Sequence, residues 1–227
     1  MAFTDRHGGA SAVPFDSLNL ALEGDDDPDV VAQNLRIVLD DFAPGDRLAD
    51  LHQVHGSEVD VVEDRPTPER PDADGLVTAR AGVVLMVRAA DCVPVLLADA
   101  DAGVVGAAHC GRPGLAAGVV PATVGRMRDL GAHAITAWIG PHVCGSCYEV
   151  PEPMRAAVGA AVPASVATTS WGTPSLDLGA GVRAQLTGEG VSVHDVSRCT
   201  RESEDLYSYR RDGDRAGRLA GLIRLRS

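Results

Sequence analysis

The chain has 227 residues, a formal net charge of −12 and an apolar content of 45%, which suits a globular protein of one large or two small domains. The acidic charge argues against binding of nucleic-acid phosphates, which requires clustered cations, and no stretch approaches the ~20 apolar residues that span a membrane. The start of the chain lacks the pattern of a secretory signal, and 5 cysteines are too sparse for a disulfide scaffold. We therefore expect a cytoplasmic protein with no nucleic-acid or membrane partner.

Hydrophobic periodicity and turn residues predict the order of helices and strands. In chain order, the predicted elements are a helix over 29–39, a loop over 63–74, strands over 83–87, 93–98 and 104–108, a helix over 114–130 that Pro121 kinks or delays, a strand over 135–139, helices over 151–161 and 176–186, and strands over 191–196 and 219–225. Short links between strands, mixed with separated helices, indicate an α+β fold with mixed β-sheets. The chain has no internal repeat or low-complexity linker, so we expect a single domain over residues 1–227.

Three residues, His55, Cys92 and His109, stand out because each lies in a short segment punctuated by glycine or aspartate. Two imidazoles and one thiolate form a catalytic type of zinc site, since three protein ligands leave a fourth position open for water or substrate. A lone cysteine or histidine is more often structural, so the prediction depends on all three meeting. We expect His55 on a loop that follows Leu51.

The sequence around Cys92 gives a reason for two of these ligands to meet. Two apolar runs on either side of a turn of Asp, Ala and Gly predict a β-hairpin. In the expected register Val93 lies opposite His109 and Cys92 opposite Cys110, so Cys92 and His109 share the open end. Strict pleating would point them to opposite faces. Because Pro94 cannot donate to the ladder, we expect irregular pairing that turns Cys92 inward.

A phosphate-binding segment is suggested by Arg112 and its neighbours. All 20 basic residues are arginine, which excludes P-loop and Schiff-base lysine chemistry, so any phosphate must be held by arginine, backbone N–H groups or metal. The segment 111–114 (Gly-Arg-Pro-Gly) comes directly before a predicted helix, whose free N–H groups can bind an anion. An ordinary glycine turn fits the same residues equally well.

Cys144 and Cys147 form the one Cys-x-x-Cys pair of the sequence. A zinc ribbon is excluded because it needs a second such pair. A thioredoxin-type dithiol would have to open a helix, whereas residues 148–151 (Tyr-Glu-Val-Pro) follow here, so a redox role is not favoured.

Residues 205–211 hold two tyrosines and two arginines. Two aromatic rings and two guanidinium groups suit the binding of an aromatic, phosphorylated or nucleoside ligand. The same residues equally fit the end of an amphipathic strand.

Short motifs follow one another along almost the whole chain. They are 4–9 (TDRHGG), 17–20 (SLNL), 53–56 (QVHG), 90–92 (ADC), His109, 139–141 (IGP), 147–150 (CYEV), 199–200 (CT), 208–211 (SYRR) and 217–218 (GR). Each motif is weak alone, but in this order they resemble the YfiH-like family, also called the laccase-domain or polyphenol-oxidase-type family.

This resemblance implies a fold, an activity and a cofactor. The family's fold looks like an α/β layered sandwich related to bacterial cysteine-hydrolase toxins. Its members act as purine nucleoside phosphorylases on adenosine, inosine or methylthioadenosine, with adenosine deaminase activity. Their zinc-binding residues fall on His55, Cys92 and His109, so zinc is the expected cofactor and copper is less favoured. The expected partners are purine nucleosides and phosphate, and the expected assembly is a monomer or weak homodimer.

Two departures from the family pattern concern the phosphate contacts. The family usually has His-Ala-Gly-Trp-Arg-Gly where residues 109–114 are His-Cys-Gly-Arg-Pro-Gly, so the arginine moves by one place. The family's Asn-Arg pair on the first helix becomes Asn-Leu-Arg at 34–36. We expect Arg112, with Arg6 or Arg36, to neutralise the phosphate.

The remaining expected roles follow from phosphorolysis and deamination at the expected zinc site. The catalytic residues are His55, Cys92, His109 and Asp91, of which Asp91 orients a ligand or shuttles a proton. Asn19 and Tyr148 are expected to hold the sugar or the base.

Three other functions stay open. The first is a thiol hydrolase with Cys92 as nucleophile and His109 as base. The second is a copper-dependent polyphenol oxidase, for which the 7 histidines are few because a multicopper site needs many. The third is a structural zinc with four protein ligands, for which Cys110 is the candidate fourth ligand.

Overall fold

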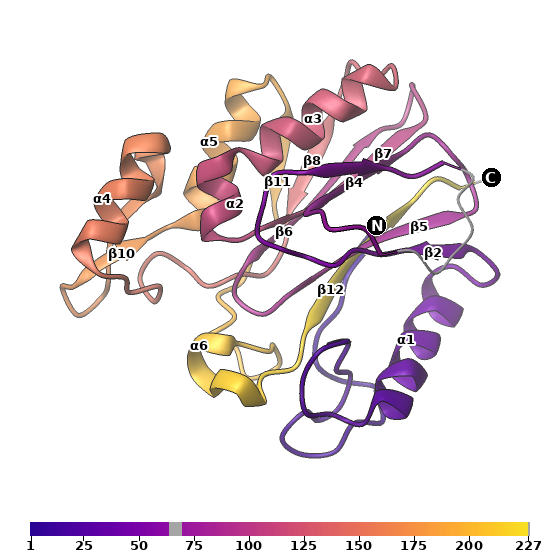
Figure 1. The fold of residues 1–227 in the computed structure, drawn as a ribbon, viewed down its shortest axis with the longest axis horizontal. Coiled ribbons are helices and arrows are strands. Elements are labelled where there is room, and N and C mark those ends of the chain that lie inside the picture. Colours follow the sequence, from indigo (N-terminus) through magenta and orange to yellow (C-terminus); the bar gives the residue numbers. More distant parts are fainter. Residues whose placement is uncertain (64–69, 227) are drawn as a thin grey trace.

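The computed structural model describes residues 1–63 and 70–226 and contains two main β-sheets with helices on their outer faces (Figure 1). The helices are α1 (Pro28–Phe42), α2 (Arg112–Ala117), α3 (Val119–Asp129), α4 (Glu152–Ala161), α5 (Leu178–Gly188) and α6 (Tyr209–Asp212), with 3-10 turns η1 (Pro163–Ser165) and η2 (Gly213–Arg215). The strands are β1 (Ala2–Phe3), β2 (Arg47–Ala49), β3 (Val59–Val61), β4 (Gly75–Thr78), β5 (Val83–Ala89), β6 (Val93–Asp99), β7 (Val104–Cys110), β8 (Thr136–Ile139), β9 (Val166–Thr168), β10 (Pro174–Leu176), β11 (Ser192–Asp195) and β12 (Leu219–Arg224). The predicted α+β class with mixed sheets is confirmed.

Both main sheets mix parallel and antiparallel pairs. The larger sheet has the strand order β11-β8-β6-β7-β4-β3 and the smaller one β1-β12-β5-β2, while β10 and β9 form a separate pair. Strand β8 pairs parallel with β11 but antiparallel with β6, and β5 pairs parallel with β2 but antiparallel with β12. The consecutive strands β5 and β6 therefore belong to different sheets.

Strand β5 explains how the two sheets form one layered core. Val83, Leu85 and Val87 pack with side chains of the larger sheet, whereas Val84 and Met86 pack on the opposite side with α1. Because successive strand residues point to opposite faces, an unbroken apolar run indicates burial on both faces. Helices α3 and α5 cover the outer face of the larger sheet (Figure 1), which gives a helix–sheet–sheet–helix order of layers.

The predicted helix over 114–130 is two helices, α2 and α3, and the break between them lies at Gly118 rather than at Pro121, as predicted. Gly118 has φ 83° and ψ 37°, the left-handed conformation that ends a helix and favours glycine. Pro121 lies in the first turn of α3, where its missing N–H costs no hydrogen bond. The helix α2 also starts earlier than predicted, at Arg112.

The β6–β7 hairpin forms, but its register differs by one residue from the predicted one. Val93 pairs with Cys110 rather than His109. The ladder includes Asp99, whose carboxylate accepts hydrogen bonds from two backbone N–H groups of the turn at 3.1 and 3.0 Å, and this shortens the turn. Cys92 therefore lies just before the first paired residue of the hairpin.

One other helix boundary differs from the prediction because of neighbouring residues. The predicted helix over 176–186 begins later because Leu176 ends β10 and the Asp177 side chain caps α5, accepting the N–H of Ala180. The predicted loop over 63–74 lies partly outside the described residues.

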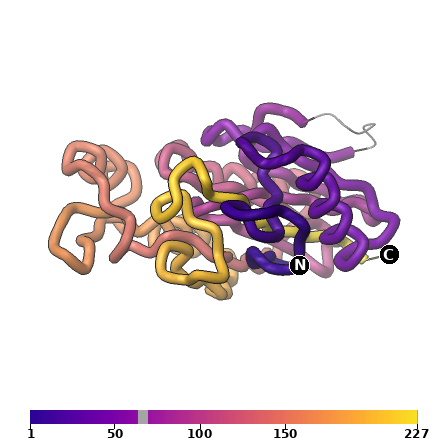
Figure 2. The backbone as a smooth tube through the Cα atoms, turned by 90° about the horizontal axis from the view of Figure 1, so that it is seen from below, coloured from indigo at the N-terminus to yellow at the C-terminus, as the bar shows by residue number. Residues whose placement is uncertain are grey.

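Within the described part of the chain, no helix is both long and apolar enough to cross a membrane. Figure 2 shows the segment from α4 to β10 at one end of the molecule, away from the two termini.

Candidate metal centre

His55, Cys92 and His109 lie together at one end of the larger sheet. Their ligand atoms are all within 4.8 Å of one another. The Sγ of Cys92 is 3.7 Å from Nε2 of His55, and the two imidazole rings meet edge to face with centroids 4.9 Å apart. Donor atoms of a tetrahedral zinc site are about 3.5 Å apart, given bonds of about 2.0–2.3 Å. A small inward shift therefore suits this set to a metal ion.

The backbone positions these side chains through two unusual conformations. His55 (φ 59°) and Asp91 (φ 92°) are the non-glycine residues with positive φ in the described chain. Such backbone is uncommon for residues with a Cβ and is concentrated at functional sites. The irregular pairing predicted at Pro94 is not seen, because Pro94 pairs regularly with His109. Cys92 lies beside His109 next to the positive-φ backbone of Asp91, and the β6–β7 ladder is not distorted there.

Gly111 leaves the space that the metal centre occupies. A Cβ at this position would lie 2.5 Å from Cδ2 of His55, closer than such atoms approach, and in tight contact, at 3.1 Å, with Sγ of Cys92. A Cβ at Gly114 would lie 3.0 Å from the carbonyl oxygen of Gly56. The glycines of the predicted phosphate segment thus serve close packing against the loop that carries His55.

Asp74 holds two of the three ligand segments. Its Oδ1 lies 2.8 Å from Nδ1 of His109, and its Oδ2 accepts the backbone N–H of Gly56 at 2.6 Å. The carboxylate is fully buried. A carboxylate behind a histidine ligand fixes the orientation of the ring and directs its other nitrogen to the metal. Sequence reasoning missed Asp74, which stood at the end of a predicted loop with no distinguishing pattern.

The electrostatics of the site favour a thiolate. Desolvation raises the pKa of the Cys92 thiol, but the charge of His109 and hydrogen bonds to both imidazoles outweigh it and lower this pKa to about 6. Desolvation lowers the pKa of His109, and the charge of Cys92 together with the Asp74 carboxylate raises it to about 9. At neutral pH the metal-free site is thus a thiolate–imidazolium pair. The thiolate is also the form that binds zinc.

Cys110 does not contribute a fourth ligand. It follows His109 in β7, so its side chain points to the opposite face, where it is fully buried among apolar side chains. Burial raises its pKa well above the usual value of a thiol. Within residues 1–63 and 70–226, this cluster of metal-binding side chains has three members. The structural-zinc alternative with Cys110 is therefore wrong, and a tetrahedral ion held by these three side chains would keep one position free of protein ligands.

A cavity of about 680 Å³ opens beside the three ligands, a volume typical of small-molecule sites. Its lining includes Tyr148 and the arginines Arg88, Arg210 and Arg218. A set of thiolate and imidazole ligands at the wall of such a cavity suits metal-assisted chemistry on an anionic or aromatic small molecule.

Comparisons with known proteins show the family of this chain. The sequence profile of a family described as "Multi-copper polyphenol oxidoreductase laccase" matches residues 1–226. The chain belongs to this laccase-type family. The resemblance seen in the sequence is thereby confirmed.

Several known proteins are similar to this chain along nearly its whole length. A protein of Streptomyces coelicolor named purine nucleoside phosphorylase is 53% identical over 231 residues, covering 97% of this chain and 93% of its own. One of the same name from Mycobacterium tuberculosis is 46% identical over 224 residues, covering 97% and 89%. The crystal structure of YlmD from Geobacillus stearothermophilus has a TM-score of 0.88 and 34% identity, covering 99% of this chain and 91% of that one. A Neisseria meningitidis structure has a TM-score of 0.89 and 34% identity, covering 99% and 93%.

Arg88 is the most notable cavity residue that sequence reasoning missed in this family member. Its guanidinium is nearly buried, pairs with Asp50, and donates from Nε to the carbonyl oxygen of Leu20 at 2.6 Å. Its Nη2 is buried and has no hydrogen-bond partner among the described residues. An unpaired buried donor is costly, and the Arg88 side chain also contributes to the lining of the cavity. The side chain of Gln53 bonds the backbone N–H and C=O of Arg88, both at 2.8 Å, and thereby ties the His55 loop to β5.

The predicted substrate residues differ in where they lie. Tyr148 lines the cavity, where burial raises the pKa of its phenol. Asn19 is fully buried and supports the wall, because its amide oxygen accepts the N–H of Arg218 at 2.9 Å and its nitrogen donates to Asp26 at 2.9 Å.

The three arginines predicted to contact phosphate do not line this cavity. Arg6 donates to the backbone and side chain of Asp16 and lies over the Tyr207 ring, 4.8 Å from its centroid. Arg36 is exposed on α1, and Arg112 is the first residue of α2. Their role in phosphate binding stays a prediction that this geometry does not favour.

Asp91 connects the metal centre to the C-terminal segment. Its Oδ1 accepts hydrogen bonds from the hydroxyls of Thr200 at 2.6 Å and Ser208 at 2.7 Å, and its Oδ2 accepts the N–H of Arg210 at 2.6 Å. These contacts favour the predicted orienting role, while proton transfer by Asp91 stays a prediction.

The segment 205–211 divides its aromatic and basic residues between two tasks. Tyr209 and Arg210 line the cavity, as the ligand-binding interpretation requires. Tyr207 is buried and donates to the carbonyl oxygen of Phe15 at 2.6 Å, and Arg211 donates to carbonyl oxygens of the loop before it. Half of this segment therefore faces the cavity and half supports it.

Proposed function

We propose that this protein is a zinc-dependent purine nucleoside phosphorylase that acts on adenosine, inosine or methylthioadenosine and also deaminates adenosine. The proposal depends most on one observation: His55, Cys92 and His109 converge, with a coordination position free, beside a cavity lined by arginines. The names of two relatives that are 53% and 46% identical to this chain support the phosphorylase activity.

The donor set supports zinc over copper. One thiolate and two imidazoles are ligands that zinc takes in catalytic sites with an open fourth position. A multicopper centre needs several clustered histidines, and no metal-binding cluster of the described residues has more than two. When bound, zinc would polarise a substrate oxygen and lower the pKa of a water molecule towards ~7, which serves deamination.

The cavity arginines support binding of the phosphate. Arg88, Arg210 and Arg218 all line the cavity and bring positive charge to it. Guanidinium groups bind phosphate through charge-assisted hydrogen bonds. In phosphorolysis, a phosphate oxygen bonds to the anomeric carbon of the ribose while the bond to the purine breaks, and the purine leaves with the electron pair and takes a proton. The arginines would hold the phosphate on the face of the sugar opposite the base.

Tyr148 supports binding of the purine. Its ring lines the cavity, and the guanidinium of Arg210 lies 4.5 Å from the ring centroid, which fixes the orientation of the ring. Aromatic rings stack on flat bases. The cytoplasmic location, the single domain and the monomeric or weakly dimeric state stay predictions.

A thiol hydrolase is the second candidate, because the pKa of Cys92 is lowered to about 6 beside a protonated His109. A nucleophilic cysteine paired with a histidine base has this charge pattern. Such an enzyme needs no metal and loses activity on alkylation of the thiol. Activity that survives chelation and is lost on alkylation would favour the hydrolase.

Product analysis tests the proposed function. Purified protein is incubated with adenosine, with and without phosphate, before and after treatment with a chelator. We expect adenine and ribose 1-phosphate only with phosphate, inosine in both conditions (with phosphate, partly converted to hypoxanthine), and neither activity after chelation. Free ribose formed without phosphate, or no change after chelation, would contradict the proposal.

A further inference from the structure

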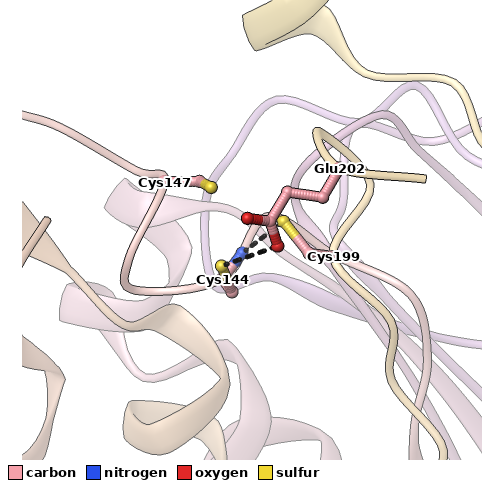
Figure 3. A group of neighbouring side chains, drawn as sticks. All are labelled: Cys144, Cys147, Cys199 and Glu202. Carbon is pink, nitrogen blue, oxygen red and sulfur yellow. Dashed lines mark hydrogen bonds between the residues drawn. The ribbon is translucent and has the colours of Figure 1, made fainter. Parts of the chain in front are cut away.

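A second group of metal-binding side chains lies outside the catalytic cavity. Cys144, Cys147, Cys199 and Glu202 place their ligand atoms within 4.8 Å of one another. Figure 3 shows that the three thiols and the carboxylate gather around one space, and that they come from two separate loops. We propose that this group binds a second zinc ion, which has a structural role.

The number and kind of ligands indicate a closed site. Three thiolates and one carboxylate complete a tetrahedron, and zinc sites filled by four protein ligands are structural. With Zn–S bonds of about 2.3 Å, sulfur atoms of such a site lie about 3.8 Å apart. The Sγ of Cys144 already lies 4.0 Å from Oε2 of Glu202. Shifts of about 1 Å or less would bring all four donors to bonding distance.

Backbone contacts hold the two loops in this arrangement. The N–H of Cys144 donates to Sγ of Cys199 at 3.5 Å, and the N–H of Cys147 donates to the carbonyl oxygen of Cys144 at 3.0 Å, which closes the Cys-x-x-Cys turn. His142 and Cys199 pair in a short parallel bridge. A Cβ at Gly145 would lie 2.8 Å from Cβ of Asp177, so the turn packs too closely for another residue. The ligands are therefore preorganised.

Two arginines lie against the loops that carry the four ligands, and one of them, Arg211, is also paired with Asp212. Arg201 donates to the carbonyl oxygen of Cys147 at 3.3 Å, and Arg211 donates to that of Thr200 at 3.0 Å. Each guanidinium thus lies against one of the two ligand loops. A zinc ion with four anionic ligands carries excess negative charge, which nearby cations stabilise.

The convergence of four groups favours a metal over the redox pair considered from the sequence. A dithiol or disulfide would need only Cys144 and Cys147, and all five cysteines are free. The sequence shows one Cys-x-x-Cys pair, and the other two ligands lie more than fifty residues further along the chain. A ribbon motif is absent, yet folding supplies a complete ligand set.

The second site would support the catalytic cavity from behind. One of its loops continues into Tyr148, which lines the cavity. The other carries Thr200, whose hydroxyl bonds Asp91 next to Cys92. A zinc ion that joins these loops would fix both cavity walls at once.

Metal content of the Cys92→Ala variant tests this proposal independently of any activity. We expect two zinc ions per wild-type chain and one per Cys92→Ala chain. After replacement by Co²⁺, the Cys92→Ala protein should retain strong thiolate-to-cobalt absorption. Adding Glu202→Gln should weaken the retention of this ion, whereas Glu204→Gln, on the same loop, should not.

Other outcomes would overturn the proposal. The first is a Cys92→Ala protein that is folded by circular dichroism but binds no metal. The second is equal metal retention in the Glu202→Gln and Glu204→Gln variants. The third is a Cys144–Cys147 disulfide in protein whose thiols were blocked during lysis. Because the readout is metal bound without Cys92, failure here would leave the proposed phosphorylase function untouched.

Discussion

The Nδ1 atom of His109 lies 2.8 Å from Oδ1 of Asp74, and neither side chain is more than 4% exposed. This contact leaves Nε2 of His109 as the nitrogen that faces Cys92 and a metal ion. The other carboxylate oxygen holds the backbone next to His55. One buried carboxylate therefore sets the geometry of ligands that lie on different elements.

Asp74→Asn should weaken zinc binding at the catalytic site by about 10–100-fold, the usual cost of losing a hydrogen-bond partner behind a histidine ligand. The measurement is competition with a coloured chelator. Asp72→Asn is the matched control, because Asp72 is exposed and bonds His52 instead. Equal zinc affinity in the two variants would remove the role given to Asp74.

Alkylation of the metal-free protein should reveal the charge state of Cys92. Its pKa is lowered to about 6, so the rate of reaction with iodoacetamide should rise with a midpoint near pH 6, well below the usual ~8.5 of a thiol. Peptide mass mapping identifies the modified residue, and added zinc should protect it. A midpoint near that of an ordinary thiol would show that His109 does not stabilise the thiolate.

Arg88→Gln should raise the KM for phosphate about tenfold or more, because hydrogen bonds to charged groups contribute about 1.5–3 kcal/mol. Adenosine deamination uses no phosphate and should be much less affected. Arg36→Gln, at an exposed position of α1, should change neither activity. A thermal melt checks that Arg88→Gln remains folded, and a parallel loss of both activities would point to a role other than phosphate binding.

Asp99→Asn should lower stability in a pH-dependent way. The N–H groups of Ala102, His133 and Ala134 lower the pKa of Asp99 to about 2. A carboxylate with a lowered pKa stabilises the fold above its unfolded pKa of about 3.9, and this contribution is lost as the pH falls towards 2. The Tm of the variant should be lower than that of the wild type at pH 7, and the difference should shrink below about pH 4. Asp101→Asn, in the same turn, is the control.

The sequence predicted that His55, Cys92 and His109 would lie together because their residue types and glycine-rich surroundings are chemically unusual. It could not predict Asp74 and Arg88. Asp74 bonds His109, which lies 35 residues away in the sequence. Arg88 interrupts an apolar strand, and only the two-sheet core explains why that strand is buried. Contacts of this kind depend on which strands become neighbours.

The errors in the predicted secondary structure had causes in single residues. The hairpin register shifted because the Asp99 side chain binds the turn, and one predicted helix divided in two because Gly118 adopts a left-handed conformation. Both residues carried a recognisable turn signal. The second ligand group was beyond prediction, since Cys199 and Glu202 join the Cys-x-x-Cys turn only through the folded chain.

The most direct test of the central claim compares phosphorolysis by Cys92→Ala with that by Cys110→Ala, with zinc content measured on the same samples. Cys92 is a proposed ligand, whereas Cys110 is a neighbouring cysteine buried in the core. We predict that the Cys92→Ala variant loses one zinc ion and that its rate of phosphorolysis falls at least a thousandfold. The Cys110→Ala variant should keep both its zinc content and its rate. A folded Cys92→Ala protein that lacks zinc at this site and still forms ribose 1-phosphate at the wild-type rate would contradict the account.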